Sequence, residues 1–527
     1  MAKKLICILL LISMLCTAAV ACTKNEINIG NNGNEGSTKD TEEQTTDVVD
    51  TEADTETETE TETEAKTEAD TEADTESEVE ESKTESEDTE AEDTEDEKSE
   101  APTPIMENFG GYQFRVLTRG DGAWKSDDIT GSAGGSRVSI ATYNRNAVLK
   151  NRHNFEIIED KNKNWLNIAT VKCGSGEDLY DMISVRLNEV PTLGQSGILY
   201  NLNEVDGLNL DADYYDQITR HQGTFANYLF FLTGDMIYND DAATGAVFYN
   251  NTIWNENKFT EEYGKDIYGL VRDMEWTFEK MIAMSKKVTV DDGNGVWGTE
   301  DYYGCSYTNV AILCFSIGLG NDLLKKDADD IFYMDSGEKI INDLADIFEF
   351  FNSGSCMKDY GSFKVGLALF SAGWITSLPT ELPNTGIDYG VIPFPMRDED
   401  QENYRSMISA YGSNCITICS SVRDIDKTAN IVELISYESL STLTPALKQW
   451  LFEGRGVPRV EDVEMLEIIM DTKTYELCYL WSTGALYSTM INLNNANGEG
   501  IKSAMDGCEE AVVASVKRKL DRLNQLA

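Results

Sequence analysis

The chain has 527 residues and a formal net charge of −51, from 94 acidic and 43 basic side chains. So large a negative excess disfavours nucleic acid as a partner, because its phosphates would be repelled. About half of the excess lies in residues 39–100, which hold 30 acidic and 4 basic side chains. The chain after residue 106 contains the aromatic residues and is long enough for a large core or two lobes.

The first 21 residues predict an export signal. Lys3 and Lys4 precede an apolar run that ends at Ala21, which is too short and one-sided for a membrane span. The end of this run, AVAC, resembles the lipobox of bacterial lipoproteins. The resemblance implies cleavage before Cys22 and a lipid such as palmitate on Cys22, with the protein anchored to the extracellular face of the cell membrane. The alternative is an ordinary secretory signal with an incidental cysteine.

Residues 22–106 predict a disordered tether. The segment includes TETETETE, lacks aromatic residues and has a high charge density, so burial cannot offset the entropy lost on ordering it. Charge repulsion should keep it extended. Alternatively, the segment is a repeat whose length has no function.

The body begins with alternating short apolar runs and helical periods. Strands are predicted over 112–118, 155–159 and 180–185, and helices over 137–152 and 165–171. This β-α-β-α-β order predicts a parallel sheet, in which ligands bind beyond the carboxyl ends of the strands. The loop 119–136 follows the first strand and is therefore a candidate binding loop. Further helices are predicted over 276–287, 338–352 and 509–527, and a strand over 388–395.

The cysteines and histidines do not predict a metal site or a catalytic centre. Eight of the 11 cysteines lie in the body, without a CxxC pair, and the chain has 2 histidines. Most cysteines should be small core residues, and any disulfide pairing stays open. The sequence contains no P-loop and no Ser-His-Asp arrangement, so we expect no cofactor, no metal and no enzymatic activity.

Several motifs follow one another in an order that resembles a known family. They are FLTGD (231–235), VFYNNTIWNENKF (247–259), EWTFEKMIAMSKK (275–287), KVGLALFSAGWITSL (364–378), DYGVIPFP (388–395) and CITICSSVRDIDKTANIVELIS (415–436). The series is similar to family 1 of the extracellular solute-binding proteins of bacterial ABC importers, the carbohydrate-binding lipoproteins. The resemblance covers most of residues 110–520 and is looser over 457–490.

The resemblance implies a two-lobed α/β protein with the type II periplasmic-binding-protein-like fold, each lobe a mixed sheet flanked by helices. The solute-binding domain would span 107–527. Lobe 1 would comprise about 107–235 plus 412–456, and lobe 2 about 236–411 plus 457–527. The chain would cross between lobes near 233–249, 395–412 and 454–458. The resemblance also implies a monomer that binds a small-molecule solute and delivers it to ABC permease subunits. An oligosaccharide is the first expectation for this solute.

Sugar recognition requires aromatic platforms and planar polar groups, which selects the candidate ligand-binding residues. The resemblance implies Trp374 and Trp481 as stacking rings, and Asp235 as an acceptor beside a crossing. Position alone adds Arg119, Asp121 and Trp124 in the first-strand loop, and Tyr411 before Gly412. For each, a solvated loop, a core or a cap role is the alternative.

Two other interpretations stay open. The segment 290–301 resembles an EF-hand loop, but Val290 and Asp301 stand where the strongest calcium ligands belong, so an acidic turn is favoured. The whole protein could instead be a surface glycan-processing enzyme that uses paired carboxylates, or an adhesion or wall-associated module on a stalk.

Overall fold

The computed structural model describes residues 104–120, 127–359, 361–452, 457 and 459–526. These residues belong to one compact unit. The predicted signal peptide, Cys22, residues 22–103 of the predicted tether, Asp121 and Trp124 lie outside the described residues. Within the described ranges, no helix combines the length and apolar character needed to cross a bilayer.

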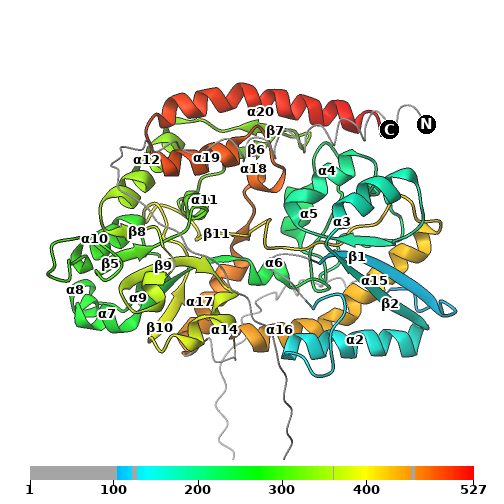
Figure 1. Ribbon diagram of the computed structural model, residues 1–527, viewed down its shortest axis with the longest axis horizontal. Coiled ribbons are helices and arrows are strands. Elements are labelled where there is room, and N and C mark those ends of the chain that lie inside the picture. Colours follow the sequence, from blue (N-terminus) through cyan, green and yellow to red (C-terminus); the bar gives the residue numbers. More distant parts are fainter. Residues whose placement is uncertain (1–103, 121–126, 360, 453–456, 458, 527) are drawn as a thin grey trace, which may run out of the picture. The chain divides into compact units, whose positions relative to one another are not determined.

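The first sheet has three parallel strands in the order β2-β1-β3. Its elements are β1 (Tyr112–Arg119), α2 (Arg137–His153), β2 (Phe155–Asn162), α3 (Trp165–Asn167) and β3 (Met182–Ser184) (Figure 1). The predicted β-α-β-α-β order and the parallel pairing are confirmed. Local signals set the bounds of α2: Ser136 accepts the Ser139 N–H at its start, and Asn154 ends it in the left-handed conformation. We call this sheet, with the helices that pack on it, the amino-terminal lobe.

The second sheet has five strands in the order β10-β4-β9-β5-β8 and is mixed. Its strands are β4 (Gly245–Asn250), β5 (Tyr303–Ser306), β8 (Cys356–Met357), β9 (Ala368–Trp374) and β10 (Tyr389–Ile392). β10 is shorter than the predicted strand because Pro393 and Pro395 lack the N–H that a ladder requires. We call this part the carboxyl-terminal lobe. A mixed sheet was expected in both lobes, whereas the three strands of the first sheet are all parallel, with antiparallel bridges such as Leu199–Cys419 outside the named strands.

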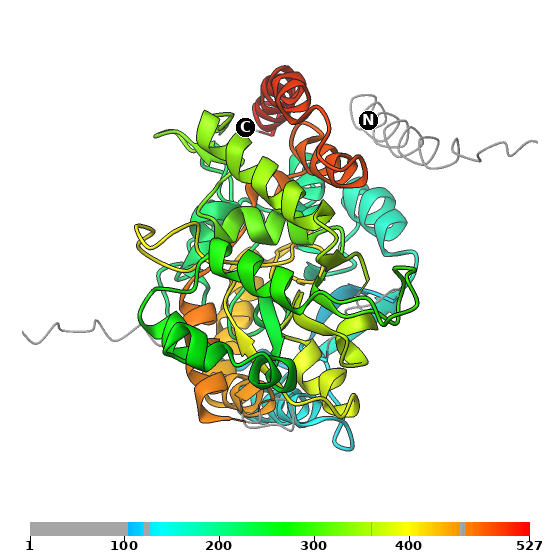
Figure 2. The same ribbon diagram turned by 90° about the vertical axis from the view of Figure 1, so that its left-hand side faces the viewer.

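Helices cover both sheets (Figures 1 and 2). The predicted helices near 276–287 and 338–352 are confirmed as α10 and α12, and the last helix begins at Ile501 rather than at Glu509. The remaining helices and short strands are α4 (Val190–Gln195), α5 (Gln217–Gly223), α6 (Asn239–Ala242), α7 (Asn251–Glu256), α8 (Phe259–Tyr263), α9 (Ile267–Arg272), α10 (Phe278–Val288), α11 (Ala311–Gly318), β6 (Leu324–Lys326), β7 (Phe332–Met334), α12 (Glu338–Asn352), α13 (Gly361–Lys364), α14 (Ser377–Thr380), β11 (Ser406–Met407), α15 (Ile425–Ser441), α16 (Leu443–Phe452), α17 (Val460–Asp471), β12 (Lys473–Thr474), α18 (Leu477–Leu480), α19 (Leu486–Asn495) and α20 (Ile501–Leu523).

Segments far apart in sequence connect the two lobes. α15 and α16 pack against α2 of the amino-terminal lobe, whereas α17 packs against β10 and α9 of the carboxyl-terminal lobe. β11 and β12 pair in parallel, and Thr244 forms an antiparallel bridge with Ile408 beside them. The last helix, α20, contacts α4 and α12, so it touches both lobes (Figure 1).

Candidate functional site

The carboxyl edge of the first sheet is the place where a ligand is expected in this kind of fold. β1 ends there at Arg119 and β3 at Ser184, and both residues are buried. The charges of Arg119, Asp128 and Glu189 all act on the thiol of Cys415, so each of the three lies in the neighbourhood of that thiol. The edge therefore gathers charged side chains from the end of β1, from the loop after β1 and from the loop after β3, near a thiol from the segment after β11.

The loop after β3 contacts the segment that contains Tyr411. The N–H of Leu187 donates to the carbonyl of Ser413 at 3.1 Å, and the N–H of Asn188 donates to the carbonyl of Ala410 at 3.2 Å. This contact places the Arg186 guanidinium 4.2 Å from the centre of the Tyr411 ring, a cation–π geometry. Tyr411 itself is 41% exposed.

Arg186 also forms an ion pair with Glu189, with 3.4 Å between its Nη1 and Oε1. Arg186, Glu189 and Tyr411 thus combine a planar cation, a carboxylate and a partly exposed ring. Arg186 and Glu189 were not among the site residues predicted from the sequence. The signal was present, because both follow the predicted strand 180–185 at its carboxyl end.

A pair of tyrosines lies next to Tyr411. The rings of Tyr479 on α18 and Tyr487 on α19 stack with 4.6 Å between centroids and 15° between planes. Burial raises the pKa of Tyr479, and hydrogen bonds with the Ser409 side chain and the Tyr411 backbone oppose the rise. Tyr479 is almost fully buried, whereas Tyr487 is half-buried. Neither tyrosine was predicted from the sequence as a site residue.

Trp374 ends β9 beside the segments that connect the lobes. It pairs with Gly245 of β4, and the next residue, Ile375, donates its N–H to Thr244 at 2.9 Å. Its ring is half-buried and packs against the main core. Trp374 therefore retains some exposed surface at the carboxyl end of a central strand.

No family model and no curated protein matches the chain. In fold, it matches the galacto-N-biose/lacto-N-biose I-binding protein of an ABC transporter from Bifidobacterium longum, with a TM-score of 0.53 and 12% identity over 78% of this chain and 99% of that one. It also matches the cyclic α-maltosyl-1,6-maltose binding protein from Arthrobacter globiformis, with a TM-score of 0.52 and 14% identity over 78% of this chain and 100% of that one. A third match, with a TM-score of 0.51 and 13% identity over 78% of this chain and 99% of that one, is described as a de novo designed esterase.

The chain has the fold of an ABC-transporter solute-binding protein. This confirms the predicted two-lobed, periplasmic-binding-protein-like α/β architecture. In such a fold, Arg186, Tyr411 and Trp374 lie where the strands of the two lobes end and the connecting segments begin.

The structure places the carboxylate of Asp235 against α16 of this solute-binding fold. Thr444 donates its hydroxyl to Asp235 Oδ1, and the Asp235 N–H donates to the carbonyl of Tyr214 at 3.0 Å. Desolvation raises the pKa of Asp235 to about 6, although the Thr444 hydroxyl opposes the rise. At least one carboxylate oxygen is therefore occupied within the protein.

Replacing Asp235 by Asn should stabilise the protein at pH 8 by about 1–2 kcal/mol and leave it unchanged below pH 4. The pKa of Asp235 is higher in the folded protein than in the unfolded chain, so its charged form destabilises the fold. The contribution of Asp235 to stability is fully present below the pKa of the unfolded chain and is lost as pH rises through the folded-state pKa of about 6. The amide keeps an acceptor for Thr444 but carries no charge. Urea unfolding from pH 4 to pH 8 measures the difference, and a constant offset between variant and parent would contradict the expectation.

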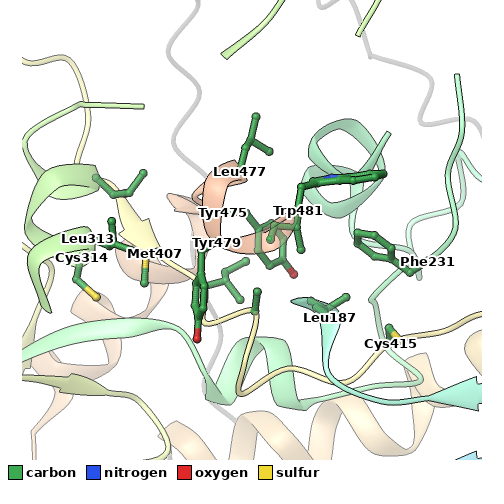
Figure 3. Close-up of a cluster of buried hydrophobic side chains, with 14 of the residues drawn as sticks. Leu187, Phe231, Leu313, Cys314, Met407, Cys415, Tyr475, Leu477, Tyr479 and Trp481 are labelled. Atoms are coloured by element: carbon green, nitrogen blue, oxygen red, sulfur yellow. The ribbon is translucent and has the colours of Figure 1, made fainter. Parts of the chain in front are cut away.

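Among the candidates within the described residues, Trp481 is the aromatic ring that lies inside the hydrophobic core. Its side chain is 1% exposed and contacts the rings of Phe225, Phe231 and Phe332 at centroid distances of 5.3, 6.4 and 5.4 Å. Figure 3 shows Trp481 and Phe231 within this buried cluster. In this structure Trp481 is not available to a solute. The sequence motif around it gave no sign of this burial, because the three phenylalanines come from distant segments.

The acidic segment before β5 forms a compact turn. The carboxylate oxygens of Asp291, Asp292 and Asp301 lie within 4.8 Å of one another. Both oxygens of Asp301 accept backbone N–H groups, from Asp292 at 2.8 Å and from Gly298 at 2.6 Å. Asp301 therefore organises the turn, and the EF-hand alignment did not select Asp291 as a member of this group.

Proposed function

We propose that this protein is an exported receptor that binds an oligosaccharide between its two lobes and presents it to an ABC permease. The observation that carries the proposal is the fold, which matches that of a lacto-N-biose binder and of a cyclic maltosyl-maltose binder over nearly their full lengths. Binding would shift the lobes from an open to a closed arrangement. The protein itself would perform no chemistry.

The residues at the lobe junction support a sugar as the solute. Tyr411, Tyr487 and Trp374 keep part of their rings exposed, and aromatic rings stack on the apolar C–H faces of sugars. Arg186, on the Tyr411 ring, and Glu189 are planar groups that donate to, or accept from, pairs of hydroxyls. We include Arg119 in the proposed site because it ends β1 at the carboxyl edge of the first sheet.

The amino-terminal segment supports membrane anchoring as part of the proposal. A lipid on Cys22 would hold the protein at the extracellular face of the cell membrane, and residues 22–106 would serve as a flexible tether to the binding domain. Asp121 and Trp124, in the loop after β1, remain proposed ligand contacts. The proposed partners are two permease subunits, and the protein itself is proposed to be a monomer.

The proposal is tested by thermal-shift screening of the full chain against mono- and oligosaccharides, amino acids and sugar phosphates. A ligand bound only by the native state raises the unfolding temperature, and a solute at about 100 times its Kd adds about 2.7 kcal/mol of stability. The solute found in this way is then titrated calorimetrically and incubated with the protein for a long period. A shift with an oligosaccharide and no product supports the receptor; cleavage of the glycan would favour a glycan-processing enzyme.

Replacing Trp374 by Ala should weaken binding of that solute by about 10- to 100-fold, because a stacking platform of about 1–3 kcal/mol is lost. The fold should persist, since the ring is only half-buried. The matched control is Trp297→Ala: Trp297 is 55% exposed and lies in the acidic turn before β5, at the opposite strand end from Trp374. Unchanged affinity of the Trp374 variant would remove this ring from the proposed site.

A further inference from the structure

Two cysteines face each other across neighbouring strands of the carboxyl-terminal lobe. Cys305 of β5 and Cys356 of β8 are register partners in a parallel ladder. Side chains alternate along a strand, so register partners project from the same face of the sheet. Paired strands are about 4.8 Å apart, and a disulfide requires a Cα separation of about 4.4–6.8 Å. The backbone therefore already satisfies the distance requirement.

The two thiols differ in their exposure. Cys305 is fully buried and donates its thiol weakly to the carbonyl of Ser306 at 3.5 Å, whereas Cys356 is half-buried. Burial raises the pKa of Cys356, so the attacking thiolate is a minor form and the exchange is slow even at pH 8. The register pairing places the two side chains next to each other, and the partly exposed Cys356 is the thiol that a reagent can reach. β8 is a short edge strand, so it can shift to meet the disulfide geometry.

We propose that Cys305 and Cys356 form a disulfide bond when the protein meets a small-molecule disulfide such as glutathione disulfide. The thiolate of Cys356 attacks one sulfur of the donor, forms a mixed disulfide and releases one glutathione thiolate. The thiolate of Cys305 then attacks the Cys356 sulfur and releases the second glutathione. Two protein thiols lose two electrons and two protons, and one glutathione disulfide is reduced to two glutathione molecules.

The bond would fasten an edge of the second sheet. β8 follows α12 and pairs with β5 alone in the sheet order. A covalent link at this edge closes the loop between β5 and β8, which contains α11, β6, β7 and α12, and so restricts the unfolded chain. The bond would form without the solute and without the permease, so it goes beyond the proposed function.

The test is peptide mapping of the full chain after equilibration at pH 8 with glutathione disulfide, followed by denaturation and alkylation with iodoacetamide. The expected result is a cross-linked peptide pair that contains Cys305 and Cys356, lighter than the two free peptides by two hydrogen atoms. Dithiothreitol should separate the pair and lower the unfolding temperature by about 2–5 °C. Alkylation of both residues in the denatured, oxidised protein would overturn the proposal.

Two variants make the result specific. In Cys356→Ser, Cys305 should become alkylated and the unfolding temperature should no longer respond to dithiothreitol. Cys314→Ser, which changes a buried thiol on α11 of the same lobe, should keep both the cross-link and the response. The map also separates this pair from Cys173 and Cys419, whose thiols are hydrogen-bonded to each other in the amino-terminal lobe. A cross-link confined to that second pair would contradict the proposal.

Discussion

Replacing Trp481 by Ala should lower the free energy of unfolding by about 3–5 kcal/mol. The indole is 1% exposed and contacts three phenylalanine rings, so its removal exposes a cavity that the surrounding rings cannot fill without moving. The cluster joins Phe225 and Phe231, which follow α5, to Phe332 of β7 and to Trp481 after α18. The loss should therefore weaken the contact between segments that are far apart in sequence.

Urea unfolding followed by far-ultraviolet circular dichroism measures this loss. The matched control is Trp297→Ala, which removes the same side chain from an exposed turn and should change stability by less than about 0.5 kcal/mol. Similar losses in both variants would mean that the contacts of Trp481 do not stabilise the fold. A ligand test on the same proteins is informative as well, because a Trp481 variant that still folds should bind solute with the parent's affinity.

Replacing Lys473 by Met should destabilise the protein by about 3 kcal/mol at neutral pH. The Lys473 ammonium lies 2.6 Å from Asp216, 2.8 Å from Asp241 and 3.7 Å from Asp240, and its side chain is 15% exposed. Burial alone would lower the pKa of Lys473, but the three carboxylates outweigh burial and raise it. Without the lysine, three carboxylates would share a site of low polarity with no cation to balance them.

The pH dependence distinguishes this mechanism from a loss of packing. Burial and the charge of Asp241 already raise the pKa of Asp240, and removing Lys473 should raise it further. Because a carboxyl group with a raised folded pKa loses stability as pH rises, the deficit of the variant should shrink from pH 8 to pH 5. Unfolding curves at several pH values measure it, and a deficit independent of pH would contradict the electrostatic cause.

An exposed ion pair supplies the control for Lys473. Lys150 and Glu156 lie 2.9 Å apart with side chains 56% and 48% exposed. Lys150→Met should change stability by less than about 1 kcal/mol at any of these pH values, because solvent screens the pair. Comparing the Lys150 and Lys473 variants tests whether the loss of stability depends on burial of the ion pair and not only on its presence. Lys473 also belongs to β12, which pairs with β11 beside the connecting segments.

The sequence by itself determined the local order of elements in the amino-terminal lobe. The runs at 112–118 and 155–159 alternate apolar side chains, and Ser136 and Asn154 supply caps for the helix between them. These are interactions among residues close in the chain, so their pattern is readable without the fold. The predicted order of strands and helices also identified the carboxyl edge of this sheet, where Arg119 lies, as the expected place of a ligand site.

Only the tertiary structure decided which side chains meet. Arg186 lies on Tyr411, Asp235 bonds Thr444, and neither pair is signalled by spacing, because each is separated by more than 200 residues. Trp374 and Trp481 stand in similar apolar contexts in the sequence, yet one keeps exposed surface and the other has none. The physical reason is that burial depends on packing against distant segments, whereas periodicity reports only on the face that one segment presents.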